Sequence, residues 1–224
     1  MIRRFSLPAF AVVSIIEILS RFFNWQTSHV VCKPLLIPLL TLYYCQSVSS
    51  IQRTFAAALV FCWLGDVFLL GDQTNELFFL AGLGSFLIAH LLLIFCFRRF
   101  RLAGEERQST QRVRLSFPVV MAGSGLVTVL YPKLGDLKIP VMVYAMTLAL
   151  MVLQSIFRLG RTGAKSFRLV FIGATSFMLS DSLLAINKFY RPLPYAGVWI
   201  MITYLAAMYL IVQGVISHQQ HEQV

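Results

Sequence analysis

The chain has 224 residues, of which 58% are hydrophobic and 12% charged, and its mean hydropathy is +0.76. A soluble domain of this composition would leave most of its apolar surface in water, so the composition excludes a soluble protein and indicates a bilayer protein. The net charge of +10 would suggest a nucleic-acid partner in a soluble chain. Here the basic residues fall at the ends of apolar runs, which is typical of membrane topology, and we expect no nucleic-acid binding.

Apolar runs bounded by charges, Pro or Gly predict an all-α bundle of eight transmembrane helices, forming a single transmembrane domain over residues 1–224. Each spanning helix needs roughly 20 apolar residues, so a chain of this length has room for about eight spans and for no soluble domain. No segment alternates with the period of a barrel strand. The expected spans are 6–23, 30–47, 54–71, 77–97, 116–132, 139–157, 167–187 and 194–216.

The basic residues are divided unequally between the two sides of the predicted bundle. The side that holds the N-terminus and the second, fourth and sixth loops carries thirteen Lys and Arg residues, and the other side carries six. This asymmetry predicts that both termini lie in the cytoplasm. The thirteen are Arg3, Arg4, Arg53, Arg98, Arg99, Arg101, Arg107, Arg112, Arg114, Arg158, Arg161, Lys165 and Arg168.

The cysteines and the histidines of the tail give no sign of a metal site. Each of the four cysteines stands alone inside an apolar run, so we expect packing residues and neither a zinc site nor a disulfide framework. They are Cys32, Cys45, Cys62 and Cys96. His218 and His221 have metal-ligand spacing, but no further ligands accompany them in the sequence. We therefore expect no metal and no cofactor.

Ionisable residues inside the apolar runs are the candidate functional residues, because a charge at the bilayer centre costs about 2.5–3.5 kcal/mol on insertion scales. In the predicted topology most of them fall in the non-cytoplasmic half, as the lining of one polar cavity open to that side would. Asp181 and Lys188 are seven residues apart and are expected to share a helix face. The candidates are Glu17, Lys33, Asp66, His90, Asp181 and Lys188.

The same residues could instead have purely structural roles. Either aspartate could be paired with Lys33 or hydrogen-bonded to its neighbours instead of acting on a ligand. Lys33 and Lys188 could extend to the membrane interface, where an ammonium is hydrated. His90 could donate a hydrogen bond between helices.

Residues 82–90 and 173–181 match at a Gly, a Ser and a Phe, and both end on an ionisable residue. The two predicted spans run in opposite directions, so a true repeat would have inverted topology, which is typical of transporters. Gly and Ser also recur wherever membrane helices pack closely, so packing alone can explain the match.

Four motifs lie on the second, third, fourth and seventh predicted spans. They are Lys33-Pro34-Leu35, Leu64-Gly65-Asp66, Gly82-Leu-Gly-Ser85-Phe86 with His90, and Phe177-Met-Leu-Ser180-Asp181-Ser182 with Asn187-Lys188. In this combination and order the sequence resembles the YhhN/TMEM86 family, which contains the lysoplasmalogenases. The resemblance covers nearly the whole chain and is weakest over residues 98–165.

The resemblance implies a membrane hydrolase that cleaves the vinyl-ether bond of lysoplasmalogen, releasing a fatty aldehyde and a glycerophospho-ethanolamine or -choline. Hydrolysis of a vinyl ether needs a carboxylic acid that protonates the β-carbon and a carboxylate that stabilises the resulting cation and activates water. Asp66 and Asp181 are the expected pair. His90 is expected to orient one of them or to relay a proton.

The remaining polar residues of these motifs are expected to bind the substrate. Lys33 and Lys188 would hold the lysolipid phosphate as point charges, and Glu17, Asn187 and Ser180 complete the set. The expected partners are the lysophospholipid and membrane lipids, and the oligomeric state stays open. The expected location is the cytoplasmic membrane of a bacterium or the endoplasmic reticulum of a eukaryote.

A transporter of small solutes or lipids, with an outward-facing acidic cavity, is the alternative. Such a protein is expected to show Gly or Pro interruptions in paired spans. Pro34 and Pro38 fall in the second predicted span, and the other half of the chain has no matching pair.

Overall fold

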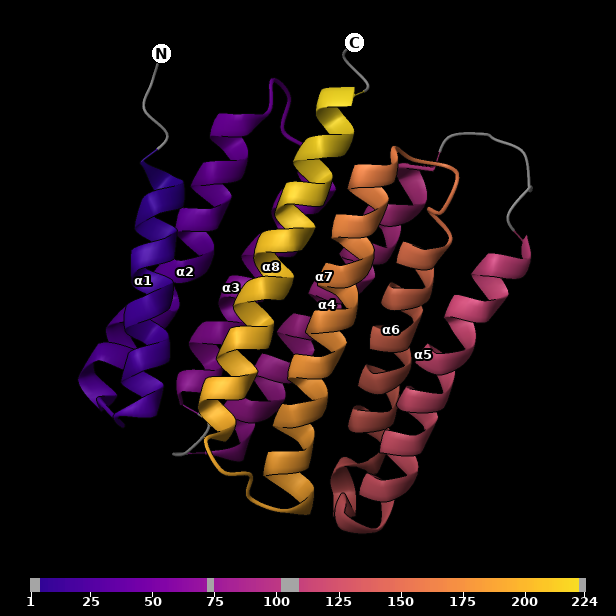
Figure 1. Cartoon of the computed structure of the whole chain (residues 1–224). Helices are drawn as coiled ribbons and strands as arrows, with labels where there is room; N and C mark the ends of the chain where they lie inside the picture. The colour runs from indigo at the N-terminus through magenta and orange to yellow at the C-terminus, as the bar shows by residue number, and fades with distance from the viewer. Residues whose placement is uncertain (1–4, 72–74, 102–108, 222–224) are drawn as a thin grey trace. The chain divides into compact units, whose positions relative to one another are not determined.

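The computed structural model describes residues 5–71, 75–101 and 109–221, and all of the regular structure in these ranges is helical (Figure 1). This confirms the prediction of an all-α protein. Two 3-10 turns, Tyr131–Lys133 and Gly135–Leu137, join α5 to α6, and a π-helical turn, Ile186–Tyr190, follows α7. The α-helices are α1 (Ser6–Phe22), α2 (Gln26–Ser47), α3 (Arg53–Leu70), α4 (Glu76–Arg99), α5 (Ser109–Leu130), α6 (Lys138–Ile156), α7 (Ala164–Ala185) and α8 (Ala196–His221).

Seven helical segments of the described chain, from α2 to α8, are long and apolar enough to cross a membrane. The chain is therefore a multi-pass membrane protein. Helix α1 has 17 residues, which is at the lower end of the roughly 17–25 that a span needs. An eighth span at α1 stays a prediction.

The buried face of α1 is mostly polar and its exposed face is apolar. Its buried face carries Ser14, Glu17 and Ser20, whereas Val12 and Ile15 are 55% and 58% exposed. A soluble helix would bury the aliphatic side chains and expose the glutamate. This inverted pattern favours α1 as a span.

The chain divides into two compact units, Met1–Leu93 and Ile94–Val224. In the first unit α1 packs on α2, and α2 packs on α3. In the second unit the most extensive pairing joins α7 and α8, while α6 packs against both α5 and α7. The expectation of a single transmembrane domain over the whole chain stays a prediction.

Glycine permits the close approach of α7 and α8. A Cβ on Gly173 would lie 3.0 Å from the carbonyl oxygen of Ala207, and one on Gly214 would lie 2.5 Å from a methyl carbon of Val170. In the first unit, a Cβ on Gly82 would lie 2.9 Å from a methyl carbon of Leu69. Helix packing thus accounts for the glycines that the two matched segments share, so this match needs no internal repeat.

Helix α2 runs unbroken through two prolines, Pro34 and Pro38. Proline has no N–H, so Pro38 cannot donate to the carbonyl of Pro34, one turn earlier. The indole N–H of Trp63 on α3 donates to that carbonyl at 3.0 Å. A neighbouring helix thereby satisfies a backbone group that lipid could not.

The cysteines and His218 lie among apolar groups. None of the four cysteines forms a disulfide within the described ranges, and three of them, Cys32, Cys62 and Cys96, are buried. The His218 ring packs against Phe100 with 4.3 Å between the ring centroids. The side chain of His221 lies outside the described part of the structure, as do three residues of the charge count, Arg3, Arg4 and Arg107.

Candidate functional site

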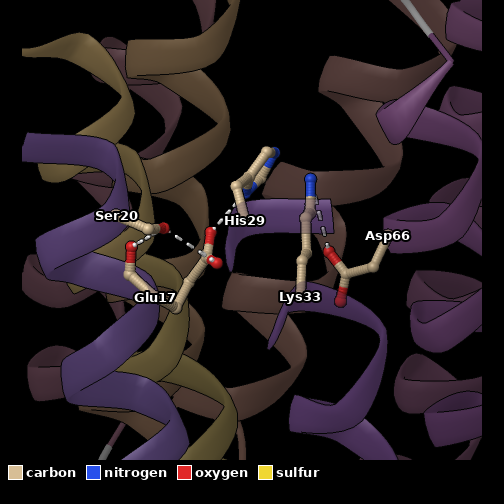
Figure 2. A network of polar contacts seen from close by, with 5 residues as sticks. All are labelled: Glu17, Ser20, His29, Lys33 and Asp66. Atoms are coloured by element: carbon tan, nitrogen blue, oxygen red, sulfur yellow. Dashed lines mark hydrogen bonds and ion pairs between the residues drawn. The ribbon is translucent and has the colours of Figure 1, made fainter. Parts of the chain in front are cut away.

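Five polar side chains from α1, α2 and α3 gather inside the first unit, and we call them the polar cluster (Figure 2). They are Glu17, Ser20, His29, Lys33 and Asp66. The cluster includes three residues selected from the sequence alone, Glu17, Lys33 and Asp66. It adds two that were not selected, Ser20 and His29.

Glu17 and His29 form the first half of the polar cluster. Nδ1 of His29 lies 2.7 Å from Oε1 of Glu17, whose side chain is fully buried. Ser20, one turn later on α1, donates to the backbone carbonyl of Glu17 at 2.7 Å and lies 3.4 Å from its Oε2. His29 is therefore a close polar partner of this buried carboxylate, and the Ser20 hydroxyl, whose single proton goes to the backbone carbonyl, lies near its other oxygen.

Lys33 and Asp66 form the second half. Nζ of Lys33 on α2 lies 4.0 Å from Oδ1 of Asp66 on α3. Lys33 is 9% exposed and Asp66 2%, so the ammonium points inward to the carboxylate and not to the membrane interface (Figure 2). His29 and Lys33 are four residues apart and lie on one face of α2, which brings the two halves together.

The position of Asp66 depends on the residue before it. A Cβ on Gly65 would lie 2.6 Å from ring carbons of Phe86, so only glycine lets this ring of α4 lie on the backbone of α3. Phe86 and His90 are four residues apart on α4, and His90 is fully buried. The motif that contains Gly65 and the motif that contains Phe86 therefore contact each other, α3 through its backbone and α4 through the Phe86 ring.

Asp181 lies on α7 in the second unit, where it accepts a hydrogen bond from the hydroxyl of Tyr144 on α6. Tyr144 was not selected from the sequence, because tyrosine is common in apolar helices and carries no charge to mark it. Ser180 is 2% exposed and donates to the carbonyl of Ile200 on α8 at 3.1 Å. The Ser-Asp pair thus contacts both helices that flank α7.

Asn187 and Lys188 belong to the π turn that follows α7. Oδ1 of Asn187 accepts from the backbone N–H of Leu193 at 3.0 Å, and this bond holds the loop before α8. Lys188 is exposed. The N–H of Arg191 bonds the carbonyl of Ile186, five residues earlier, so the turn is wider than an α-turn. The expectation that Asp181 and Lys188 share a helix face stays a prediction.

The polar cluster sets two carboxylates against two basic groups inside an apolar unit. Burying four such groups costs free energy that well-packed apolar side chains would not, so function is the default explanation. A carboxylate beside an ammonium can stabilise a cation or accept a proton, and the ammonium can also bind an anion. In the described ranges no group of three or more His, Cys, Asp or Glu side chains is placed to hold a metal ion.

Comparisons with known proteins give a consistent result. The family model described as the YhhN family matches residues 28–215. Human lysoplasmalogenase TMEM86B is 30% identical over 188 residues, which are 84% of this chain and 74% of that protein. Human lysoplasmalogenase TMEM86A is 31% identical over 178 residues, 76% of this chain and 68% of that protein. A lysoplasmalogenase of Mycobacterium tuberculosis is 33% identical over 165 residues, 73% of this chain and 60% of that protein. No solved structure matches.

Proposed function

The chain belongs to the YhhN family, and on this premise we propose that it is a lysoplasmalogenase, a membrane enzyme that hydrolyses the vinyl-ether bond of lysoplasmalogen. The observation that carries the proposal is the similarity, over 84% of the chain, to a human protein named lysoplasmalogenase. The buried carboxyl group of Asp66 and the partly buried one of Asp181 would supply the acid and base that this reaction needs. The products are a fatty aldehyde and glycerophospho-ethanolamine or -choline.

The reaction consumes one water molecule. A proton adds to the β-carbon of the vinyl ether and leaves an oxocarbenium ion at the carbon bonded to oxygen. Water adds to that carbon and loses a proton, which gives a hemiacetal. The hemiacetal hydroxyl then loses its proton as the carbon–oxygen bond to glycerol breaks, and the glycerol oxygen takes up a proton, which leaves the aldehyde and the alcohol. A positioned carboxylic acid and carboxylate each typically accelerate such proton transfers by about 10²–10⁴-fold.

We assign Asp66 as the carboxylate and Asp181 as the acid. The assignment rests on the partners of the two groups, and Asp66 lies 4.0 Å from the ammonium of Lys33. A carboxylate can stabilise the oxocarbenium ion and take a proton from water. Asp181 accepts a hydrogen bond from the hydroxyl of Tyr144, and a hydroxyl can be a partner for a carboxyl group in both its protonated and its ionised form. His90 is retained as the residue that orients a carboxylate or relays a proton.

The substrate-binding roles follow from charge and position. The ammonium of Lys33 has three donors, so it can face Asp66 and still hold a lysolipid phosphate. Lys188, exposed in its π turn, is a second phosphate ligand. The substrate-binding set also includes Glu17, which would bind the ethanolamine or choline cation. Its last members are Asn187 and Ser180, which shape the loop and the helix beside Asp181.

We further propose that α1 is the eighth span and that both termini are cytoplasmic, because the positive-inside count favours that side. The membrane is then the cytoplasmic membrane of a bacterium or the endoplasmic reticulum of a eukaryote. A transporter is the second candidate. The unbroken course of α2 through Pro34 and Pro38 does not provide the helix interruption that a transporter site uses.

One assay tests the function. The purified, monodisperse protein is incubated with lysoplasmalogen, and aldehyde release is measured. The matched control is the lysolipid with a saturated alkyl ether, which has no double bond to protonate and should stay intact. In D2O the aldehyde should carry one deuterium on the carbon next to the carbonyl group. Absence of aldehyde release would overturn the enzyme assignment, and uptake by proteoliposomes would then support the transporter.

A further inference from the structure

Four arginines of the second unit form what we call the arginine cluster: Arg101, Arg112, Arg158 and Arg161. Each has a buried Nε that makes no hydrogen bond to the described part of the chain, and the same is true of Nη1 of Arg158. The ion pairs of the polar cluster, Glu17 with His29 and Lys33 with Asp66, include none of these arginines. The cluster therefore concentrates positive charge and unused donors at one place.

The guanidinium groups are held at the C-terminal end of α6. Nη2 of Arg112 donates to the carbonyl of Leu159 at 2.9 Å, and Arg101 donates to the side-chain oxygen of Gln154. Nη2 of Arg158 donates to Ser166 at 2.8 Å. The end of a helix carries about half a negative charge, so it attracts these cations but cannot balance four of them.

The charge of the cluster persists at neutral pH. Burial, together with the nearby guanidinium groups of Arg161, Arg98 and Arg112, lowers the pKa of Arg101 to about 10. Burial likewise lowers the pKa of Arg158 to about 10, and its guanidinium lies 5.6 Å and 5.8 Å from the ring centres of Phe97 and Phe100. Both groups stay protonated near pH 7, and no ion pair found in the described part of the chain includes either of them.

An apolar groove begins at the cluster. A cavity of about 530 Å³ between α5 and α6 is lined by Arg112, Val113, Phe117, Met121 and Phe157, among others. A second cavity of about 470 Å³ shares the wall residue Val120 and continues along the seam between the same helices. Val113 and Phe117 are both 66% exposed. The positive charge of the arginine cluster and the apolar lining of the groove together match an amphipathic anion.

We propose that the arginine cluster and the α5–α6 groove bind an anionic phospholipid, with its phosphate at Arg112 and Arg101 and an acyl chain along the groove. Arginine suits this role because its planar fork of donors matches phosphate oxygens. In the proposed topology this end of the unit faces the cytoplasmic leaflet, where anionic lipids are attracted by basic segments. The proposed substrate has a zwitterionic headgroup, so this is a second lipid, bound independently of the catalytic proposal.

The test titrates delipidated, detergent-solubilised full-length protein with short-chain phosphatidylglycerol, phosphatidylcholine or inorganic phosphate, and follows the thermal unfolding midpoint. Phosphatidylglycerol should raise the midpoint and phosphatidylcholine should not. Arg112→Gln should weaken the apparent affinity about tenfold, the loss expected for one charge-assisted hydrogen bond. The matched control is Arg114→Gln, which removes the same charge from an exposed position of α5 and should leave the affinity within about twofold.

A second variant guards against misfolding, since Arg112 also bonds the carbonyl of Leu159. Val120→Trp fills the groove and leaves every arginine in place, and it should weaken phosphatidylglycerol but not inorganic phosphate. Equal losses of affinity for phosphatidylglycerol in Arg112→Gln and Arg114→Gln would overturn the proposal. It would also be overturned if inorganic phosphate raised the unfolding midpoint as much as phosphatidylglycerol does and Val120→Trp had no effect. Lipid binding that appears only in the Glu105→Gln/Glu106→Gln double variant would also overturn it, because the chain's own carboxylates would then be the native occupant.

Discussion

Nζ of Lys33 lies 4.0 Å from Oδ1 of Asp66, and both side chains are buried in the first unit. Lys33→Met keeps the length of the side chain and removes its charge, so Asp66 is left as a buried carboxylate without its ammonium. We expect a loss of roughly 3 kcal/mol in the free energy of unfolding, measured by chemical unfolding in detergent. The double variant Lys33→Met/Asp66→Asn should be more stable than Lys33→Met, because no buried charge is left unpaired. A double variant less stable than either single one would contradict this account.

Asp66→Asn and Asp181→Asn should each reduce vinyl-ether hydrolysis by at least about 10²-fold. Asparagine has nearly the shape of aspartate, but its amide cannot act as the acid or base in proton transfer. Aldehyde release from purified protein measures the effect. Asp136→Asn is the matched control, since Asp136 is exposed in the turn between α5 and α6, and it should keep normal activity. A folded Asp66 or Asp181 variant with near-normal kcat would remove that residue from the mechanism.

Glu17 and His29 should be energetically coupled, because 2.7 Å separates their polar atoms in a buried setting. We expect Glu17→Gln and His29→Ala each to lower the free energy of unfolding. The double variant should lose less than the sum, with a coupling of about 1–3 kcal/mol in a double-mutant cycle. Additive losses would mean that the contact does not stabilise the fold.

Gly65→Ala should destabilise the first unit by about 1–3 kcal/mol, because its Cβ would lie 2.6 Å from the ring of Phe86. Hydrolysis should fall with it, since Asp66 is the next residue. Gly84→Ala is the control on α4, because a Cβ there meets nothing within 4 Å. Alanine at that position should be neutral or stabilising by up to about 1 kcal/mol. Equal effects of the two substitutions, measured by thermal unfolding, would exclude the Phe86 contact as the cause.

The centres of the helices could be predicted because lipid demands long apolar runs. Their ends could not. Helix α2 begins at Gln26, before the expected start at residue 30, and α5 begins at Ser109, before the expected 116. In both cases polar residues continue a helix whose backbone bonds do not depend on hydropathy. Arg112, for example, is inside α5 and bonds the carbonyl of Leu159.

The candidate site shows the same limit. The cost of burying a charge was enough to select Glu17, Lys33 and Asp66. It missed His29, because that residue fell in an expected loop, although its spacing of four from Lys33 would have placed both on one helix face. The pairing of Lys33 with Asp66 was one of several alternatives, and only the relative position of α2 and α3 decides among them.

The hydrogen bond from Trp63 to the carbonyl of Pro34 gives a last prediction. Trp63→Phe keeps an aromatic ring but leaves that carbonyl without a donor, so we expect a loss of about 1–3 kcal/mol in the free energy of unfolding. In a Pro38→Ala background the new backbone N–H of residue 38 can donate to the same carbonyl, one turn earlier on α2. In that background Trp63→Phe should lower the free energy of unfolding by at least about 1 kcal/mol less than it does in the protein with Pro38. Chemical unfolding of the four proteins measures both costs, and equal costs in the two backgrounds would show that Trp63 stabilises α2 by packing alone.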